Sequence, residues 1–85
     1  QEAKRKERAI HRVIRGMNDL SSLVGEYVIY HEDRPLQQFL LEHKSILNLI
    51  DTIRLDDPEQ RQLLLNIRGD MELMKGSFLR LVSSR

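Results

Sequence analysis

Two prolines divide this chain into three segments, and the second proline directly follows an aspartate. Asp57 precedes Pro58, and Gln60 stands three residues after Asp57. Asp is a preferred N-cap residue, Pro is tolerated in the first helical turn, and Gln at the third position completes a capping box. A weaker start of the same kind occurs at Asp33, two residues before Pro35. The sequence therefore predicts three helices, with breaks before these two starts.

Apolar residues recur in each segment at spacings of three and four, which is typical of a helix with one buried face. We expect helices over residues 5–30, 35–54 and 58–82. The predicted core positions are Ile10, Val13, Met17, Leu20, Val24, Tyr27 and His31 in the first helix, Leu36, Leu40, His43, Leu47, Ile50 and Arg54 in the second, and Leu64, Ile67, Met71, Met74, Phe78 and Leu81 in the third. The apolar residues expected to widen these faces are Ile14, Leu23, Val28, Phe39, Ile46 and Ile53.

The apolar period of the first helix does not continue through residues 31–35. Its extension predicts apolar side chains at Arg34, Gln38 and Ser45, which are all polar, and the period restarts out of phase at Leu36. Pro35 also removes a backbone donor and disfavours helical backbone at the preceding residue. Because short connections make successive helices antiparallel, we predict an all-α fold, an antiparallel up-down-up three-helix bundle.

Length and composition restrict the class of protein. The 85 residues correspond to one domain, which we expect to come from a longer protein. The net charge of +1 argues against a strongly basic nucleic-acid-binding protein, and the absence of cysteine excludes a disulfide framework. No apolar run reaches the roughly 18 residues needed to span a bilayer. We therefore expect a cytoplasmic protein that binds neither nucleic acid nor membrane.

Residue patterns for catalysis or cofactor binding are absent from the sequence. His11, His31 and His43 do not have the spacing of metal ligands. We expect His31 and His43 to lie at the edge of the core, with one ring nitrogen of each hydrogen-bonded. The glycines are isolated, so they do not form a phosphate-binding loop. We predict no catalytic residue, no metal site and no cofactor.

Arginines gather on one face of the first predicted helix, at positions 5, 8, 12 and 15. Such a face binds an anionic surface or nucleic acid in some proteins. The interpretation we favour is pairing with the acidic residues near the second connection, where each exposed pair contributes about 0.2–1 kcal/mol. These acidic residues are Asp51, Asp56, Asp57 and Glu59.

Gly69 and Gly76 are seven residues apart and therefore share a face of the third helix. Each glycine costs about 1 kcal/mol of helix propensity relative to alanine. Two such costs on one face indicate either close approach by another backbone or glycines tolerated on the surface.

The chain resembles the BAG domain, a three-helix module of chaperone cofactors. Residues 10–20 resemble its first helix, residues 49–53 resemble the end of its second, and the apolar spacing of residues 67–78 resembles its third. The resemblance implies binding to the nucleotide-binding domain of seventy-kilodalton heat-shock chaperones. In that family an acidic residue matching Asp51 and a basic pair contact the chaperone, and Leu64 and Leu65 hold the positions of the pair here.

From this resemblance we expect a monomeric protein-interaction module that acts as a chaperone cofactor or adaptor. The partner is expected to bind the surface between the second and third helices. Alternatively, Asp51 pairs with the basic start of the first helix. The expected partner-binding residues are Glu42, Asp51, Arg61, Leu64, Leu65 and Arg68.

A second resemblance is to the dimerisation domains of histidine kinases. Residues 31–36 resemble their His-Glu-x-Arg-x-Pro-Leu box with one residue fewer, and residues 57–61 resemble the start of their second helix. This resemblance implies an alternative function in which His31 accepts a phosphoryl group. Two hairpins then form a dimeric four-helix bundle.

Overall fold

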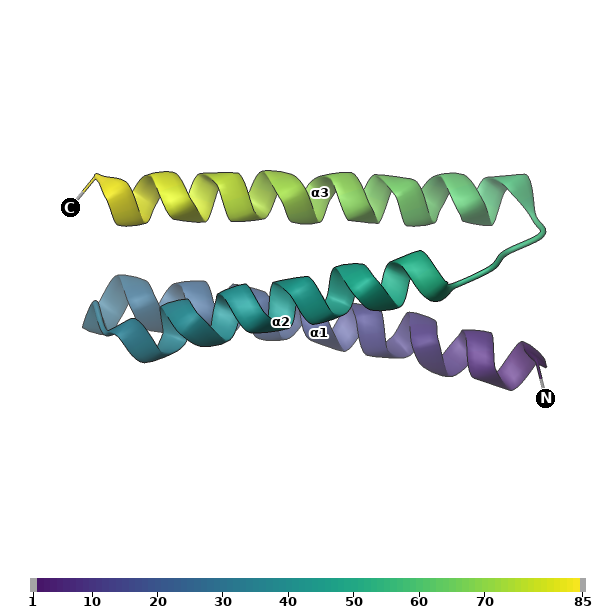
Figure 1. Ribbon diagram of the computed structural model, residues 1–85, viewed down its shortest axis with the longest axis horizontal. Coiled ribbons are helices and arrows are strands. Elements are labelled where there is room, and N and C mark those ends of the chain that lie inside the picture. The colour runs from purple at the N-terminus through teal and green to yellow at the C-terminus, as the bar shows by residue number, and fades with distance from the viewer. Residues whose placement is uncertain (1, 85) are drawn as a thin grey trace. The chain divides into compact units, whose positions relative to one another are not determined.

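The computed structural model describes residues 2–84, with side chains from residue 4 onward, and contains three α-helices. They are α1 (Glu2–Tyr30), α2 (Asp33–Thr52) and α3 (Pro58–Ser83) (Figure 1). Within this range no residue belongs to a strand, which confirms the all-α prediction. The chain forms two compact units, one ending at Ile53 and the other beginning at Arg54. None of the three helices, as described, is long and apolar enough to cross a membrane.

α1 and α2 form an antiparallel hairpin connected by His31 and Glu32 (Figure 1). His31 has left-handed backbone with φ of 53°, and its N–H donates to the Tyr27 carbonyl at 2.8 Å, which closes the last turn of α1. Pro35 lies within the first turn of α2, where a missing N–H breaks no helical hydrogen bond. α2 therefore begins two residues before its predicted start.

One ion pair joins the two helices near this connection. The Arg34 Nη2 donates to Glu26 Oε2 at 2.8 Å, and its Nη1 donates to Gln38 Oε1 at 2.7 Å. Both charged side chains are largely exposed, so the pair stabilises the hairpin by at most about 1 kcal/mol. Most of the stability must therefore come from the apolar side chains.

The buried side chains of α1 are predicted core positions, whereas in α2 the buried Phe39 and Ile46 were expected only to flank the core. The predicted core residues Leu36, Leu40 and Leu47 are half-buried, and Arg54 is exposed because α2 ends at Thr52. In α1 the buried side chains are seven residues apart, and in α2 they are separated by three or four residues. The flanking residues Ile14 and Val28 are about half exposed, so the expectation that they widen the buried face was wrong. Buried side chains of the unit are Val13, Leu20, Tyr27, Pro35, Phe39, His43, Ile46 and Ile50.

Gly16 is the position of closest approach between α1 and α2. A Cβ added at Gly16 would lie 2.7 Å from Ile46 Cγ1 and closer still to Ile46 Cδ1. A side chain at this position would therefore displace Ile46. At Gly69 and Gly76, by contrast, an added Cβ would meet no described heavy atom within 4 Å. The close approach that was considered for the third helix occurs in the hairpin instead.

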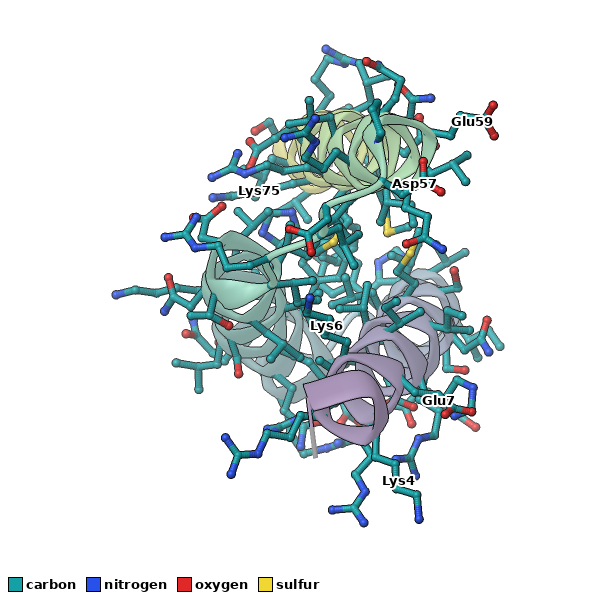
Figure 2. All side chains as sticks on the ribbon, turned by 90° about the vertical axis from the view of Figure 1, so that its right-hand side faces the viewer. Lys4, Lys6, Glu7, Asp57, Glu59 and Lys75 are labelled. Atoms are coloured by element: carbon teal, nitrogen blue, oxygen red, sulfur yellow. The ribbon has the colours of Figure 1, made fainter. Side chains whose placement is uncertain are left out.

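α3 begins at the predicted cap. The Asp57 Oδ1 accepts a hydrogen bond of 2.9 Å from the Glu59 N–H, and Pro58 occupies the first helical position. Glu59 itself points outward from this turn (Figure 2). Met71 and Phe78, seven residues apart, are buried as predicted, whereas Leu81 is exposed although the periodicity placed it on the same face.

Candidate functional site

Four of the predicted partner-binding residues form one face of α3. Arg61, Leu64, Leu65 and Arg68 are separated by three, four and seven residues, so their side chains leave the helix on the same side. Leu65 is 61% exposed, and Arg61 is also exposed. Leu64 and Arg68 are half-buried. We call these four residues the 61–68 face.

The other two predicted residues, Glu42 and Asp51, lie on α2 and do not share a face. They are nine residues apart, which at about 100° per residue places them on nearly opposite sides of the helix. Asp51 is exposed in the last turn, whereas Glu42 is half-buried and points toward α1. The structure therefore does not bring these two carboxylates to a common surface.

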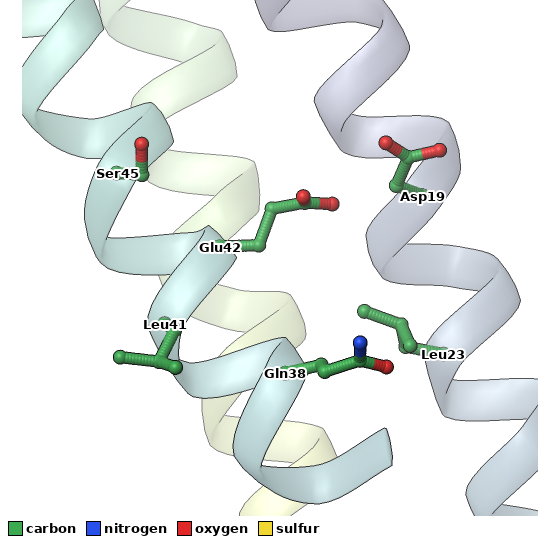
Figure 3. Close-up of a pocket in the computed structure, with 6 residues that line it drawn as sticks. All are labelled: Asp19, Leu23, Gln38, Leu41, Glu42 and Ser45. Atoms are coloured by element: carbon green, nitrogen blue, oxygen red, sulfur yellow. The ribbon is translucent and has the colours of Figure 1, made fainter. Parts of the chain in front are cut away.

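Glu42 instead approaches Asp19 across a shallow pocket between α1 and α2 (Figure 3). The pocket has a volume of about 430 Å³ and is lined by Asp19, Leu23, Gln38, Leu41, Glu42 and Ser45. Burial raises the pKa of Glu42 above its ordinary value of 4.5, and the charge of Asp19 and a side-chain hydrogen bond to Asp19 raise it further. A hydrogen bond between two carboxyl groups requires one of them to be protonated.

This carboxyl pair is suited to holding a proton and lacks the ligands of a metal site. Among the described residues, no group of three or more His, Cys, Asp or Glu side chains is placed to hold a metal ion. Sequence spacing alone does not bring residues 19 and 42 together. The pair was missed because it depends on the rotation of one helix against the other.

The histidines occupy three different environments. His43 is buried and its ring stacks on Phe39, with centroids 5.8 Å apart. His31 is exposed, and its ring stacks on Tyr27 at the same centroid distance. The expectation that both would lie at the edge of the core was wrong, because His43 lies on the buried face of α2 and His31 is exposed after the last residue of α1. No buried side-chain nitrogen or oxygen in the described range lacks a hydrogen-bond partner.

The arginine face of α1 is exposed. Its residues are solvent-accessible, and the neighbouring Lys4 and Glu7 also point outward (Figure 2). Pairing between these arginines and the acidic residues near the second connection stays a prediction. The arginines in question are Arg5, Arg8, Arg12 and Arg15.

Several exposed leucines were not part of the predicted site. Leu73 is 70% exposed and Leu63 is 61% exposed on α3, and Leu41 is 71% exposed on α2. Each lies outside the core periodicity of its helix, and this departure is the sequence signal by which they can be found. A leucine outside the buried face has no role in the core, and it indicates an interface where several such residues are contiguous.

Comparisons of the chain with protein families, with curated proteins and with solved structures found no match. The functional assignment therefore depends on the surfaces described above.

Proposed function

We propose that the chain is a helical protein-interaction module that binds its partner through the 61–68 face of α3. The observation that carries the proposal is the exposure of Leu65, at 61%, on the same face as two arginines. Arginine is enriched in interface hot spots, and an exposed leucine beside it adds apolar area that binding can remove from water. We also propose the up-down-up bundle and the cytoplasmic location that the sequence predicts.

The chemistry of this face defines the partner. Leu65 supplies an apolar anchor that enters a pocket, and the arginines orient the helix by pairing with carboxylates around that pocket. The spacing of three, four and seven residues is that of helices that bind in grooves. The partner therefore presents an apolar groove bordered by acidic residues. The BAG resemblance makes the nucleotide-binding domain of a seventy-kilodalton heat-shock chaperone the first candidate.

Leu63 offers a matched control for the test of this proposal. Leu63 and Leu65 have the same exposed fraction, 61%, but lie two residues apart and therefore on opposite sides of α3. We expect Leu65→Ser to weaken binding of the purified chaperone domain at least tenfold by isothermal calorimetry. Leu63→Ser should bind like the wild type. Equal binding by both variants would exclude the 61–68 face.

Asp51 provides a second test, specific to the BAG-like mode. Asp51 is exposed at the end of α2, within the residues that resemble the end of the second BAG helix. Asp51→Lys is expected to reduce binding to the chaperone domain with little change in melting temperature. If the melting temperature falls while the folded protein binds normally, Asp51 stabilises the fold. Failure of the chaperone domain to bind the wild type would remove the chaperone assignment, and cross-linking with mass spectrometry would then show whether another protein contacts the 61–68 face.

The alternative function is phosphoacceptance by His31. The observation in its favour is that the His31 ring is exposed and accessible to a phosphoryl donor. Incubation with acetyl phosphate or a cognate kinase core should label His31, and His31→Gln should abolish the label. His11 is exposed as well, so His11→Gln is the control for non-specific labelling. No labelling under either condition would exclude this function.

A further inference from the structure

The C-terminal half of α3 has an exposed face that begins one turn beyond Leu65, on the same side of the helix as Leu65. Leu73 is 70% exposed and Leu79 is 36% exposed on it, and their neighbours Glu72 and Arg80 are exposed as well. An open hollow of about 440 Å³ lies along this part of the helix and is lined by Gly76, Leu79, Arg80, Ser83 and Ser84. We call the set the 69–83 face, which comprises Gly69, Glu72, Leu73, Gly76, Leu79, Arg80 and Ser83.

The residues of this face are arranged symmetrically about Gly76. Leu73 and Leu79 lie three residues before and after it. Glu72 and Arg80, which carry opposite charges, lie four residues before and after it. The small residues Gly69 and Ser83 lie seven residues before and after. A two-fold axis through Gly76 therefore places each leucine and each small residue at the level of a residue of similar size. It also places each charged residue at the level of one with the opposite charge.

We propose that the 69–83 face binds a second copy of the chain, with the two α3 helices antiparallel and Gly76 at the two-fold axis. In this arrangement Glu72 lies at the level of the partner's Arg80, and Arg80 at the level of the partner's Glu72. Each leucine lies at the level of a leucine. The contact is isologous, as in most homodimers.

Charge decides the direction of the two helices. A parallel pair in register would place Glu72 beside the partner's Glu72 and Arg80 beside the partner's Arg80, which is destabilising. The antiparallel pair replaces both repulsions with two ion pairs. Arg80 has only Gly and Ser three and four residues away on its own helix, and its Nη2 donates to the Ser77 hydroxyl at 3.3 Å. Its charge is therefore not matched by an acidic residue in an adjacent turn.

Charge and size also decide the register. Moving the axis to lie midway between Gly69 and Gly76 would place Leu73 opposite the partner's Glu72. It would likewise place Leu65 opposite the partner's Arg80. The register centred on Gly76 avoids both contacts. With Gly or Ser at the closest positions, the helix axes approach to about 8 Å.

The contact is small, so the association is weak. Fifteen residues of helix span about 22 Å, and one helix pair of that length buries less area than the 1,200–2,000 Å² of stable interfaces. We expect a dissociation constant in the range of about 0.1–1 mM. The chain is then monomeric at low concentration, as the sequence predicts, and pairs when it is concentrated or tethered.

Single cysteines test the axis directly, because the chain has no cysteine of its own. In an antiparallel pair only a residue at the axis meets its own copy, so Gly76→Cys should form a disulfide-linked dimer at least tenfold faster than Gly69→Cys or Ser83→Cys. A mixture of the latter two variants should form the mixed dimer. Gly25→Cys is the control for random collision, because Gly25 is exposed on α1.

Three outcomes would overturn the proposal. Equal rates at all four positions would mean random collision, and fast dimerisation of each α3 variant alone would mean a parallel pair. A charge exchange gives an independent check by sedimentation equilibrium. Glu72→Arg and Arg80→Glu should each weaken association at least threefold, and the double variant should restore it. A double variant as weak as the singles would also contradict the proposed pairing.

Self-association and partner binding can be separated. Gly76→Leu fills the space at the axis while improving helix propensity, so the protein should stay folded and lose self-association. Its binding to the partner through the 61–68 face should not change. Leu65→Ser should have the opposite effect, because Leu65 lies outside the overlap of the two helices.

Discussion

The hairpin of α1 and α2 and the single helix α3 use their apolar residues differently. The hairpin has buried side chains on both of its helices and a close helix contact at Gly16. α3 has Met71 and Phe78 as its buried residues and exposes several leucines along its length. Because packing supplies most of the stability of helices in proteins, the hairpin is the stabilising part of the molecule. Among the described residues, α3 exposes as many large apolar side chains as the hairpin, five each, but it buries only two.

Because the hairpin holds most of the buried side chains, we expect the largest loss of stability from a substitution in its core. Phe39 is fully buried, so Phe39→Ala should lower the free energy of unfolding by about 3–5 kcal/mol, much of the stability of a small domain. Urea denaturation followed by circular dichroism measures the change. Leu41, on the same helix and 71% exposed, is the control, and Leu41→Ala should change stability by less than about 0.5 kcal/mol. Similar losses in both variants would contradict the assigned buried face.

A second prediction concerns the contact between α1 and α2. Gly16→Leu would push Ile46 out of its position and should destabilise the protein by about 1–3 kcal/mol. Gly25→Leu is the matched substitution on the same helix, with no described atom within 4 Å of the new Cβ. It should stabilise by about 0.5–1 kcal/mol because leucine is the better helix former. A higher melting temperature in both variants would show that α1 and α2 are not in close contact at Gly16.

For α3, the corresponding weak point is its cap. Asp57→Ala removes the acceptor of the Glu59 N–H and should cost about 0.5–2 kcal/mol. Hydrogen exchange at the Glu59 amide should become faster. Asp56→Ala, one residue earlier and outside the cap, should have little effect on either measurement. Unchanged exchange at Glu59 in the Asp57 variant would mean that the helix does not depend on this hydrogen bond.

The smallest predicted effect is a pH dependence confined to the hairpin. The pKa of Glu42 is raised in the folded protein, so its contribution to stability is fully present below the ordinary pKa of 4.5 and is lost as the pH rises through the raised value. Glu42→Gln should remove this loss and stabilise the protein at pH 7 by less than about 1 kcal/mol. Melting temperatures at pH 4.5 and pH 7 measure the difference. A pH dependence identical to that of the wild type would contradict the carboxyl pair.

Helix positions could be predicted from the sequence because their signals are local. Pro58 and Asp57 determine where α3 begins, and the observed start agrees with the prediction. α2 begins at Asp33 rather than at Pro35, because the first turn of a helix tolerates proline. Boundaries of this kind depend on residues that are close together in the chain, so they can be predicted from the sequence.

Contacts between helices could be predicted only in part. Periodicity identified the buried residues of α1, yet it also placed the exposed Ile14 and Val28 on the buried face. The approach of Ile46 to Gly16 and the pairing of Asp19 with Glu42 depend on helix rotation and axial shift. The periodicity of a single helix predicts neither its rotation nor its axial shift against a neighbouring helix. The grouping of Glu42 with Asp51 came from the BAG resemblance, and their spacing of nine residues already places them on opposite sides of α2.

The two-residue connection at His31 and Glu32 affects the order in which the protein folds. A short loop has a small closure entropy, and contacts near the connection join residues that are close in sequence. Helical hairpins with such local contacts fold within microseconds to milliseconds, whereas a ribosome adds about 5–20 residues per second. During synthesis the hairpin therefore has time to form before α3 is complete. The exposed leucines of α3 then emerge beside a unit that is already folded.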